Sequence, residues 1–138
     1  MAEQRSSARA YGVCIYDDRV LLVRAAKPHE GQALWWLPGG GIDFGESATE
    51  AVVREFLEET GIEVGFPHLL DVTSDTRIRD NGDRIHTIRI IYRVTALTFE
   101  LSHEVDGTTD FAQWVDLREL HNYALAPYAR VSIESVLA

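Results

Sequence analysis

The spacing of apolar residues along the chain changes between a period of two and a helical period, so the sequence predicts both strands and helices. The clearest strand pattern runs from Ile88 to Val94, where every second residue is apolar, as expected for a strand with one buried face. We expect strands at residues 11–16, 19–25, 70–79, 84–99 and 111–115, a short apolar segment at 34–37, and helical segments at 48–60, 116–120 and 128–137. A mixed sheet flanked by helices follows from this order of elements.

The helix predicted at residues 48–60 has well-defined ends. Ser47 and Glu50 have the spacing of a capping box, in which each side chain bonds the backbone of the other residue. Gly61 stands where a left-handed C-cap is expected, and the apolar Ile62 follows it. Elsewhere, Asp17-Asp18 separates the first two strands, and the sequence Asp-Asn-Gly-Asp at 80–83 indicates a hairpin turn.

The same helix has an unusual distribution of charge. A helical wheel places its bulky apolar residues on one side: Val52, Val53, Phe56 and Leu57. Glu55, Glu58 and Glu59 cluster roughly opposite, although like charges at this spacing destabilise an isolated helix by a few tenths of a kcal/mol per pair. Three carboxylates and a carbonyl oxygen from the preceding loop, Gly39–Gly41, would supply the oxygen ligands that Mg²⁺ prefers. The alternative interpretation is an ordinary solvated helix face.

Composition limits the classes of function. The 138 residues fit a single domain, with residues 1–9 as a flexible N-terminus. The net charge of -9 argues against general nucleic-acid binding, which depends on basic patches. No apolar run approaches the length of a membrane span, and the N-terminal residues have no secretory pattern. The single cysteine, Cys14, lies in an apolar stretch and fits a packed thiol in a reducing compartment. We therefore expect a cytoplasmic protein that does not bind membranes.

One motif spans the loop and the helix. Its form is G-x5-E-x7-R-E-U-x-E-E-x-G-U, where U is a bulky apolar residue, and its fixed positions are Gly40, Glu46, Arg54, Glu55, Phe56, Glu58, Glu59, Gly61 and Ile62. This pattern is the Nudix box, and the chain resembles the Nudix hydrolases. The resemblance implies the Nudix fold of the α/β class, an α/β/α sandwich with a mixed β-sheet. It also implies hydrolysis of a nucleoside diphosphate linked to a further group, with a divalent metal ion as cofactor.

Roles for individual residues follow from the resemblance. Glu55, Glu58 and Glu59 are the expected ligands of Mg²⁺, for which Mn²⁺ could substitute, and the Gly40 or Gly39 carbonyl is a further candidate ligand. Glu55 is also a candidate general base. Glu46 and Arg54 are expected to pair and brace the loop against the helix, with direct contact to metal or phosphate as the alternative.

Candidates outside the motif have weaker support. Arg24 is a candidate phosphate ligand, and the alternative is an ordinary surface arginine. Trp35 or Trp36 is a candidate platform for a base or ribose, and the alternative is packing in the core. The hairpin arginines and histidine are either solvated or in contact with phosphate or sugar: Arg77, Arg79, His86 and Arg89. Members of the family take an additional ligand or base from the region before a tryptophan such as Trp114, where Glu104 and Asp110 are the candidates here.

The resulting functional hypothesis is a Mg²⁺-dependent pyrophosphohydrolase that acts on a small nucleotide. The alternative is a catalytically weak Nudix domain that binds a nucleotide as a sensor, which the complete acidic set disfavours. Removal of a 5′ diphosphate from RNA is a third hypothesis, disfavoured by the acidic charge. Residues that mark ADP-ribose or dinucleoside polyphosphate enzymes are absent after the motif, so no single substrate is favoured. A homodimer is left open because many members of the family dimerise.

Overall fold

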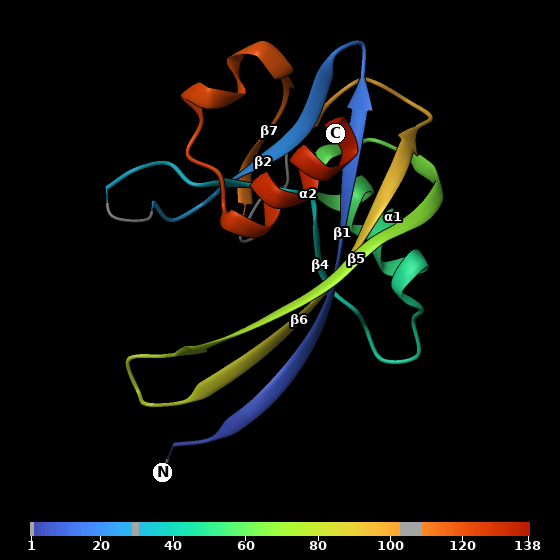
Figure 1. Ribbon diagram of the computed structural model, residues 1–138. Helices are drawn as coiled ribbons and strands as arrows, with labels where there is room; N and C mark the ends of the chain where they lie inside the picture. The colour runs from blue at the N-terminus through green and yellow to red at the C-terminus, as the bar shows by residue number, and fades with distance from the viewer. Residues whose placement is uncertain (1, 29–30, 103–108) are drawn as a thin grey trace.

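The computed structural model describes residues 2–28, 31–102 and 109–138 (Figure 1). Its elements in chain order are β1 (Gln4–Tyr16), β2 (Arg19–Ala25), β3 (Trp35–Trp36), β4 (Gly39–Gly41), α1 (Ala48–Thr60), β5 (Val64–Ile78), β6 (Arg84–Ala96), β7 (Thr109–Asp116), the 3-10 helix η1 (Leu117–Asn122) and α2 (Pro127–Leu137). All the helical segments expected from the sequence are present, and the bounds of α1 agree with the prediction.

The strands form one mixed sheet in the order β3-β2-β1-β6-β5. β1 is parallel to β6, and the other pairs are antiparallel, including β4 on β1 and β7 on β2. In Figure 1 the strands β1, β5 and β6 run together away from the helices and end near the N-terminus and the β5–β6 turn. The long central strand β1 therefore connects this three-stranded extension to the part of the sheet that carries β4.

The two helices cover opposite faces of the sheet. Ala10 packs in a core cluster with Val52 and Phe56 of α1, whereas its neighbour Tyr11 packs in a second cluster with Ile133 of α2. Successive residues of a strand point to opposite faces. The molecule is therefore an α/β/α sandwich, as expected. Figure 1 shows α2 and α1 on the two sides of β1.

Strand pairing corrects two expectations about β1 and β6. β1 begins at Gln4, so most of the stretch expected to be a flexible N-terminus is paired with β6. In β6 the expected single buried face is wrong at the centre, where Ile91 and Tyr92 are both buried. Each of these residues faces a different helix, so alternation of burial fails between Ile88 and Tyr92, whereas it holds from Arg84 to Thr87 and from Tyr92 to Thr95.

The ends of α1 agree with the sequence, but its buried side does not. The capping box of Ser47 and Glu50 is formed, and Gly61 has a φ of 75°, where a Cβ would also collide with Ser102. Val53 and Leu57, expected on the core side, are exposed. The buried side is rotated toward the glutamates, because the glycine loop as well as the sheet packs against the helix.

Two other local expectations, the tight turn after β1 and the packed thiol of Cys14, are confirmed. Asp17 and Asp18 have φ of 52° and 58°, which suits the tight turn between β1 and β2. Cys14 is fully buried, and desolvation raises the pKa of its thiol to about 12. Among the residues described, no helix is long and apolar enough to cross a membrane.

Candidate functional site

The glycine loop lies directly against two glutamates of α1. β4 is held by pairing with β1, which places Gly40 opposite Ala10. The Gly39 N–H donates to Glu59 Oε1 at 2.7 Å, and a Cβ at Gly40 would lie 2.7 Å from Glu55 Oε1. Glycine at position 40 leaves room for the Glu55 carboxylate, which a larger residue there would displace. The loop and the helix therefore form one structural unit.

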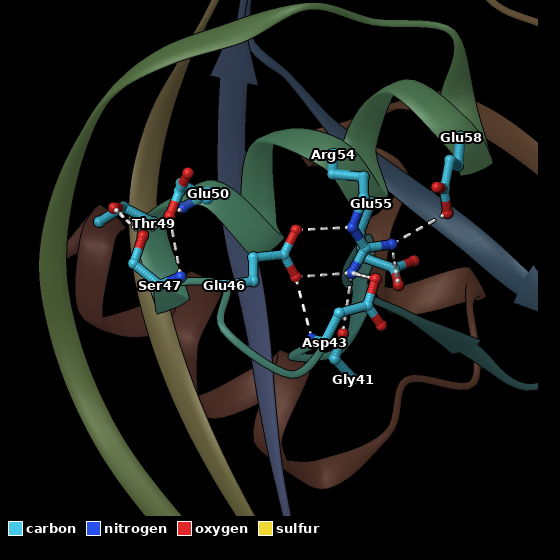
Figure 2. Close-up of polar contacts among 9 residues, drawn as sticks. All are labelled: Gly41, Asp43, Glu46, Ser47, Thr49, Glu50, Arg54, Glu55 and Glu58. Atoms are coloured by element: carbon cyan, nitrogen blue, oxygen red, sulfur yellow. Dashed lines mark hydrogen bonds and ion pairs between the residues drawn. The ribbon is translucent and has the colours of Figure 1, made fainter.

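Arg54 connects the helix to the loop through several hydrogen bonds (Figure 2). Its Nε and Nη2 donate to the two carboxylate oxygens of Glu46 at 2.8 and 2.9 Å, a bidentate arrangement. Nη2 also donates to the Gly41 carbonyl at 3.0 Å and lies 3.5 Å from Asp43 Oδ2. These contacts join α1 to Gly41 and to the loop segment that follows it, as the predicted brace requires.

The Glu46 carboxylate is held on three sides. Besides the two bonds from Arg54, it accepts the Asp43 N–H at 3.0 Å. Hydrogen bonds from the Arg54 guanidinium and then from the Asp43 backbone lower the pKa of Glu46 to about 2. The same Glu46 hydrogen bonds raise the pKa of Arg54, so both groups keep their charge over the ordinary pH range.

The three box glutamates have different surroundings. Glu55 and Glu58 both accept from Arg54 Nη1, at 3.1 and 3.2 Å, so a single positive group lies between the two carboxylates. The Glu58 side chain is 48% exposed and the Glu55 side chain 16%. Glu59 is buried and accepts from Gly39 and from the Thr109 hydroxyl, at 3.2 Å.

The arrangement is partly suited to a divalent metal ion. Among the described residues, no three Asp, Glu, His or Cys side chains converge closely enough to form a preassembled site. Glu55 and Glu58 nevertheless gather around one positive group beside the Gly40 backbone, and both offer the hard oxygen donors that Mg²⁺ prefers. The donor set fits such an ion: Glu55 and Glu58 share Arg54 as a partner, whereas Glu59 accepts from Gly39 and Thr109.

Arg24 and Asp110, predicted as a phosphate ligand and as an additional base or ligand, bind each other. Arg24 Nε donates to Asp110 Oδ1 at 2.8 Å, and the guanidinium lies 5.0 Å from the ring centroid of Phe111. The hydrogen bond from Arg24 lowers the pKa of Asp110, which makes its carboxylate a weaker proton acceptor. The other candidate for the additional role, Glu104, lies outside the described residues.

The structure places three of the other candidates, Trp35, His86 and Arg77, in different surroundings. Trp35 is buried in the core, in edge contact with Tyr123, so it packs rather than offering a ring face to solvent. His86 lies opposite Ser6 on β1, four residues before Ala10, which corresponds to about 13 Å along a strand. Arg77 lies opposite Ile85, one residue farther out on the extension. Neither reaches the glycine loop.

Sequence reasoning missed three contributors to this unit. Asp43 contacts Arg54 from the loop, Thr109 reaches Glu59 from β7, and the Gly41 carbonyl accepts from Arg54. Asp43 lies only three residues before Glu46 and was accessible to local reasoning. Thr109 was not, because it is fifty residues from Glu59 in sequence.

Comparison with known proteins identifies the family. The family model described as NUDIX domain matches residues 6–136. The chain belongs to the Nudix family. The protein named Uncharacterized Nudix hydrolase YvcI, from Bacillus subtilis, is 35% identical over 112 residues, which cover 80% of this chain and 66% of that protein. The ADP-ribose pyrophosphatase of Methanocaldococcus jannaschii is 35% identical over 114 residues, which cover 82% of this chain and 63% of that protein.

Solved structures agree with this assignment. The crystal structure of a MutT NUDIX hydrolase from Burkholderia pseudomallei superposes with a TM-score of 0.78 at 28% identity, covering 96% of this chain and 98% of the other. The family and the α/β sandwich expected from the Nudix box are thus confirmed. The matches span about two thirds of the length of the two curated relatives, at 66% and 63%.

Proposed function

We propose that this Nudix domain hydrolyses a small nucleotide, a nucleoside diphosphate linked to a further group, with Mg²⁺ as cofactor and Mn²⁺ able to replace it. The observation that carries the proposal is the placement of Glu55 and Glu58 around one positive group beside the backbone of Gly40. A cation bound there would neutralise substrate charge and lower the pKa of a bound water. The products would be a nucleoside monophosphate and a phosphorylated remainder.

In the proposed reaction, water attacks a phosphorus atom and the bond from that phosphorus to the bridging oxygen breaks. Glu55 is the candidate acceptor of the proton released by water, because its carboxylate lies against the glycine loop and is only 16% exposed. Arg54 and Glu46 hold the loop against α1 and so position Glu55. Glu59 fixes the Gly39 amide from the buried side.

The competing hypothesis is a nucleotide-binding sensor that does not turn over its ligand. The intact set of Glu55, Glu58, Glu59 and the Arg54–Glu46 brace favours hydrolysis, since a sensor has no need for a complete catalytic set. Relatives guide the choice of substrates: one is named ADP-ribose pyrophosphatase, and another, 31% identical over 103 residues, is named Nucleoside triphosphatase NudI, from Klebsiella pneumoniae.

The test is a panel of nucleoside triphosphates, nucleotide sugars and ADP-ribose, incubated with Mg²⁺ or with EDTA and followed by product identification. We expect release of a nucleoside monophosphate from at least one substrate, only with metal. Binding of a nucleotide in calorimetry without turnover of any substrate would favour the sensor instead.

Two glycine variants test the geometry of the site on the best substrate. G40A forces the Glu55 carboxylate aside, and we expect kcat/KM to fall about 100-fold, since small displacements of catalytic groups have effects of this size. G41A is the matched control, because a Cβ at this position meets no atom within 4 Å. Equal activities of the two variants would contradict the role given to Glu55.

A further inference from the structure

A row of residues crosses four strands beside the glycine loop. Strand register places Gly41 of β4 opposite Arg9 of β1, Arg9 opposite Arg89 of β6, and Arg89 opposite Thr73 of β5. Residues directly opposite each other lie on the same face of a sheet, and neighbouring strands are about 4.8 Å apart. Arg9 is therefore one strand spacing from the glycine loop, and Arg89 is two.

The two arginines have few acidic partners at ion-pair distance, although Glu55 interacts with Arg9 electrostatically at longer range. Like charges directly opposite on neighbouring strands are unfavourable. No carboxylate of the described residues forms an ion pair with Arg9, whose Nε donates instead to the Tyr11 hydroxyl at 2.6 Å. In the described part of the chain Arg89 has one ion pair, from Nη1 to Asp75 Oδ2 at 2.6 Å, and its side chain is only 17% exposed. An anion bound between Arg9 and Arg89 would therefore offset the repulsion between the two guanidinium groups.

Further polar atoms at the same place have no partner. Tyr128 of α2 packs on Tyr11 with ring centroids 4.9 Å apart, and the Arg89 guanidinium lies 4.7 Å from the Tyr128 ring centroid. Within the described chain, the buried side-chain atoms without a hydrogen-bond partner are Thr73 Oγ1, Arg89 Nε and Tyr128 Oη. All three belong to this cluster. Unpaired buried polar groups are rare in proteins and are commonly explained by a water or ion that completes the network.

We propose that Arg9 and Arg89 form an anion subsite that binds a phosphate group of the substrate other than the two joined by the scissile bond. The inference rests on the proposed function, which places the scissile diphosphate at the glycine loop. Guanidinium groups bind phosphate oxygens through several N–H donors at once, and the Nη groups of Arg9 make no hydrogen bond to any described residue. The subsite favours substrates that carry a further phosphate group, beyond the two joined by the scissile bond, over those whose further group is an uncharged sugar.

The test uses inorganic pyrophosphate as the probe, in calorimetric titrations of the full chain with EDTA present. We expect R9Q and R89Q each to weaken binding at least tenfold. R93Q is the matched control, because it removes the same charge from exposed Arg93, four residues along β6 and about 13 Å away. Its affinity should stay within twofold of the wild type. Thermal melting verifies that each variant is folded.

D75N separates binding from a structural role of Arg89. This change removes the internal carboxylate that competes for the guanidinium, so pyrophosphate affinity should be unchanged or higher. If D75N weakens binding as R89Q does, the Arg89–Asp75 pair is structural and the inference is wrong. Equal loss in R9Q, R89Q and R93Q would also overturn it, as a general charge effect. Since metal is chelated, these results do not depend on hydrolysis, and the proposed function can fail or hold independently.

Discussion

Arg54 and the Arg9–Arg89 pair carry the same kind of charge in opposite surroundings. Arg54 contacts four carboxylates and a backbone carbonyl within 3.5 Å. Arg9 has a phenol as its partner, and Arg89 has one exposed aspartate. The corner between α1 and the glycine loop thus has an excess of negative charge, whereas the row on β1 and β6 has an excess of positive charge.

This contrast suggests a division of work between two neighbouring regions. The acidic corner is suited to a cation, and Arg54 supplies part of the positive charge that it needs. The basic row is suited to an anion, because few acidic side chains of the protein itself lie close enough to neutralise it. A nucleotide bound through a metal ion would carry both kinds of charge, so the two regions are complementary to different parts of one ligand.

Removal of Arg54 should have the largest effect on stability. R54M leaves four carboxylates without their shared guanidinium, and we expect the free energy of unfolding to fall by about 1–3 kcal/mol, less than for a fully buried pair because the site is partly exposed. Urea denaturation measures this loss. R93Q, on the exposed part of β6, should stay within about 0.5 kcal/mol of the wild type.

Added Mg²⁺ sharpens the same experiment. A cation that binds the folded acidic corner stabilises it by mass action, so the denaturation midpoint of R54M should rise as Mg²⁺ is added. A midpoint that stays constant would indicate that Arg54 compensates a purely structural cluster. The comparison between the two regions would then lose its functional meaning.

The Glu46–Arg54 pair should have a smaller, pH-dependent effect. The pKa of Glu46 is lowered from its usual 4.5 to about 2 in the folded state, so the pair stabilises the protein above pH 4.5. This contribution is lost as pH falls from about 4.5 toward 2. The stability difference between wild type and E46Q should therefore be full at pH 7 and shrink over that window. Urea midpoints at a series of pH values measure it, and a difference that does not change with pH would contradict the brace.

Local signals in the sequence were sufficient to predict α1 and many of the contacts at its site. The capping box, the C-cap glycine and the Glu46–Arg54 pair all lie within the motif and depend on short-range geometry. The side of α1 that is buried was wrong at Val53 and Leu57, because it depends on how the glycine loop packs against the helix. The motif identifies the loop but does not determine this packing.

Long-range pairing accounts for the rest. β1 extends back to Gln4 because it pairs with β6, whose residues are eighty positions away, and no periodicity in the first ten residues indicates this. The same register places Arg9 beside Arg89, so the basic row is invisible until the strands are paired. The Arg24–Asp110 pair likewise joins residues eighty-six positions apart, which explains why two separate candidates turned out to be partners.

The most direct test of the central claim is a titration with Mn²⁺, in which electron paramagnetic resonance measures the free ion. Mn²⁺ accepts the same carboxylate and carbonyl ligands as Mg²⁺. E58Q is the sharpest variant, because Glu58 is 48% exposed and its single side-chain hydrogen bond among the described residues is the 3.2 Å contact with Arg54. E63Q, at an exposed glutamate just beyond α1, is the control. We predict that wild type and E63Q bind Mn²⁺ alike and that E58Q binds it at least tenfold more weakly; equal binding by all three would contradict the assignment of the acidic corner as a metal site.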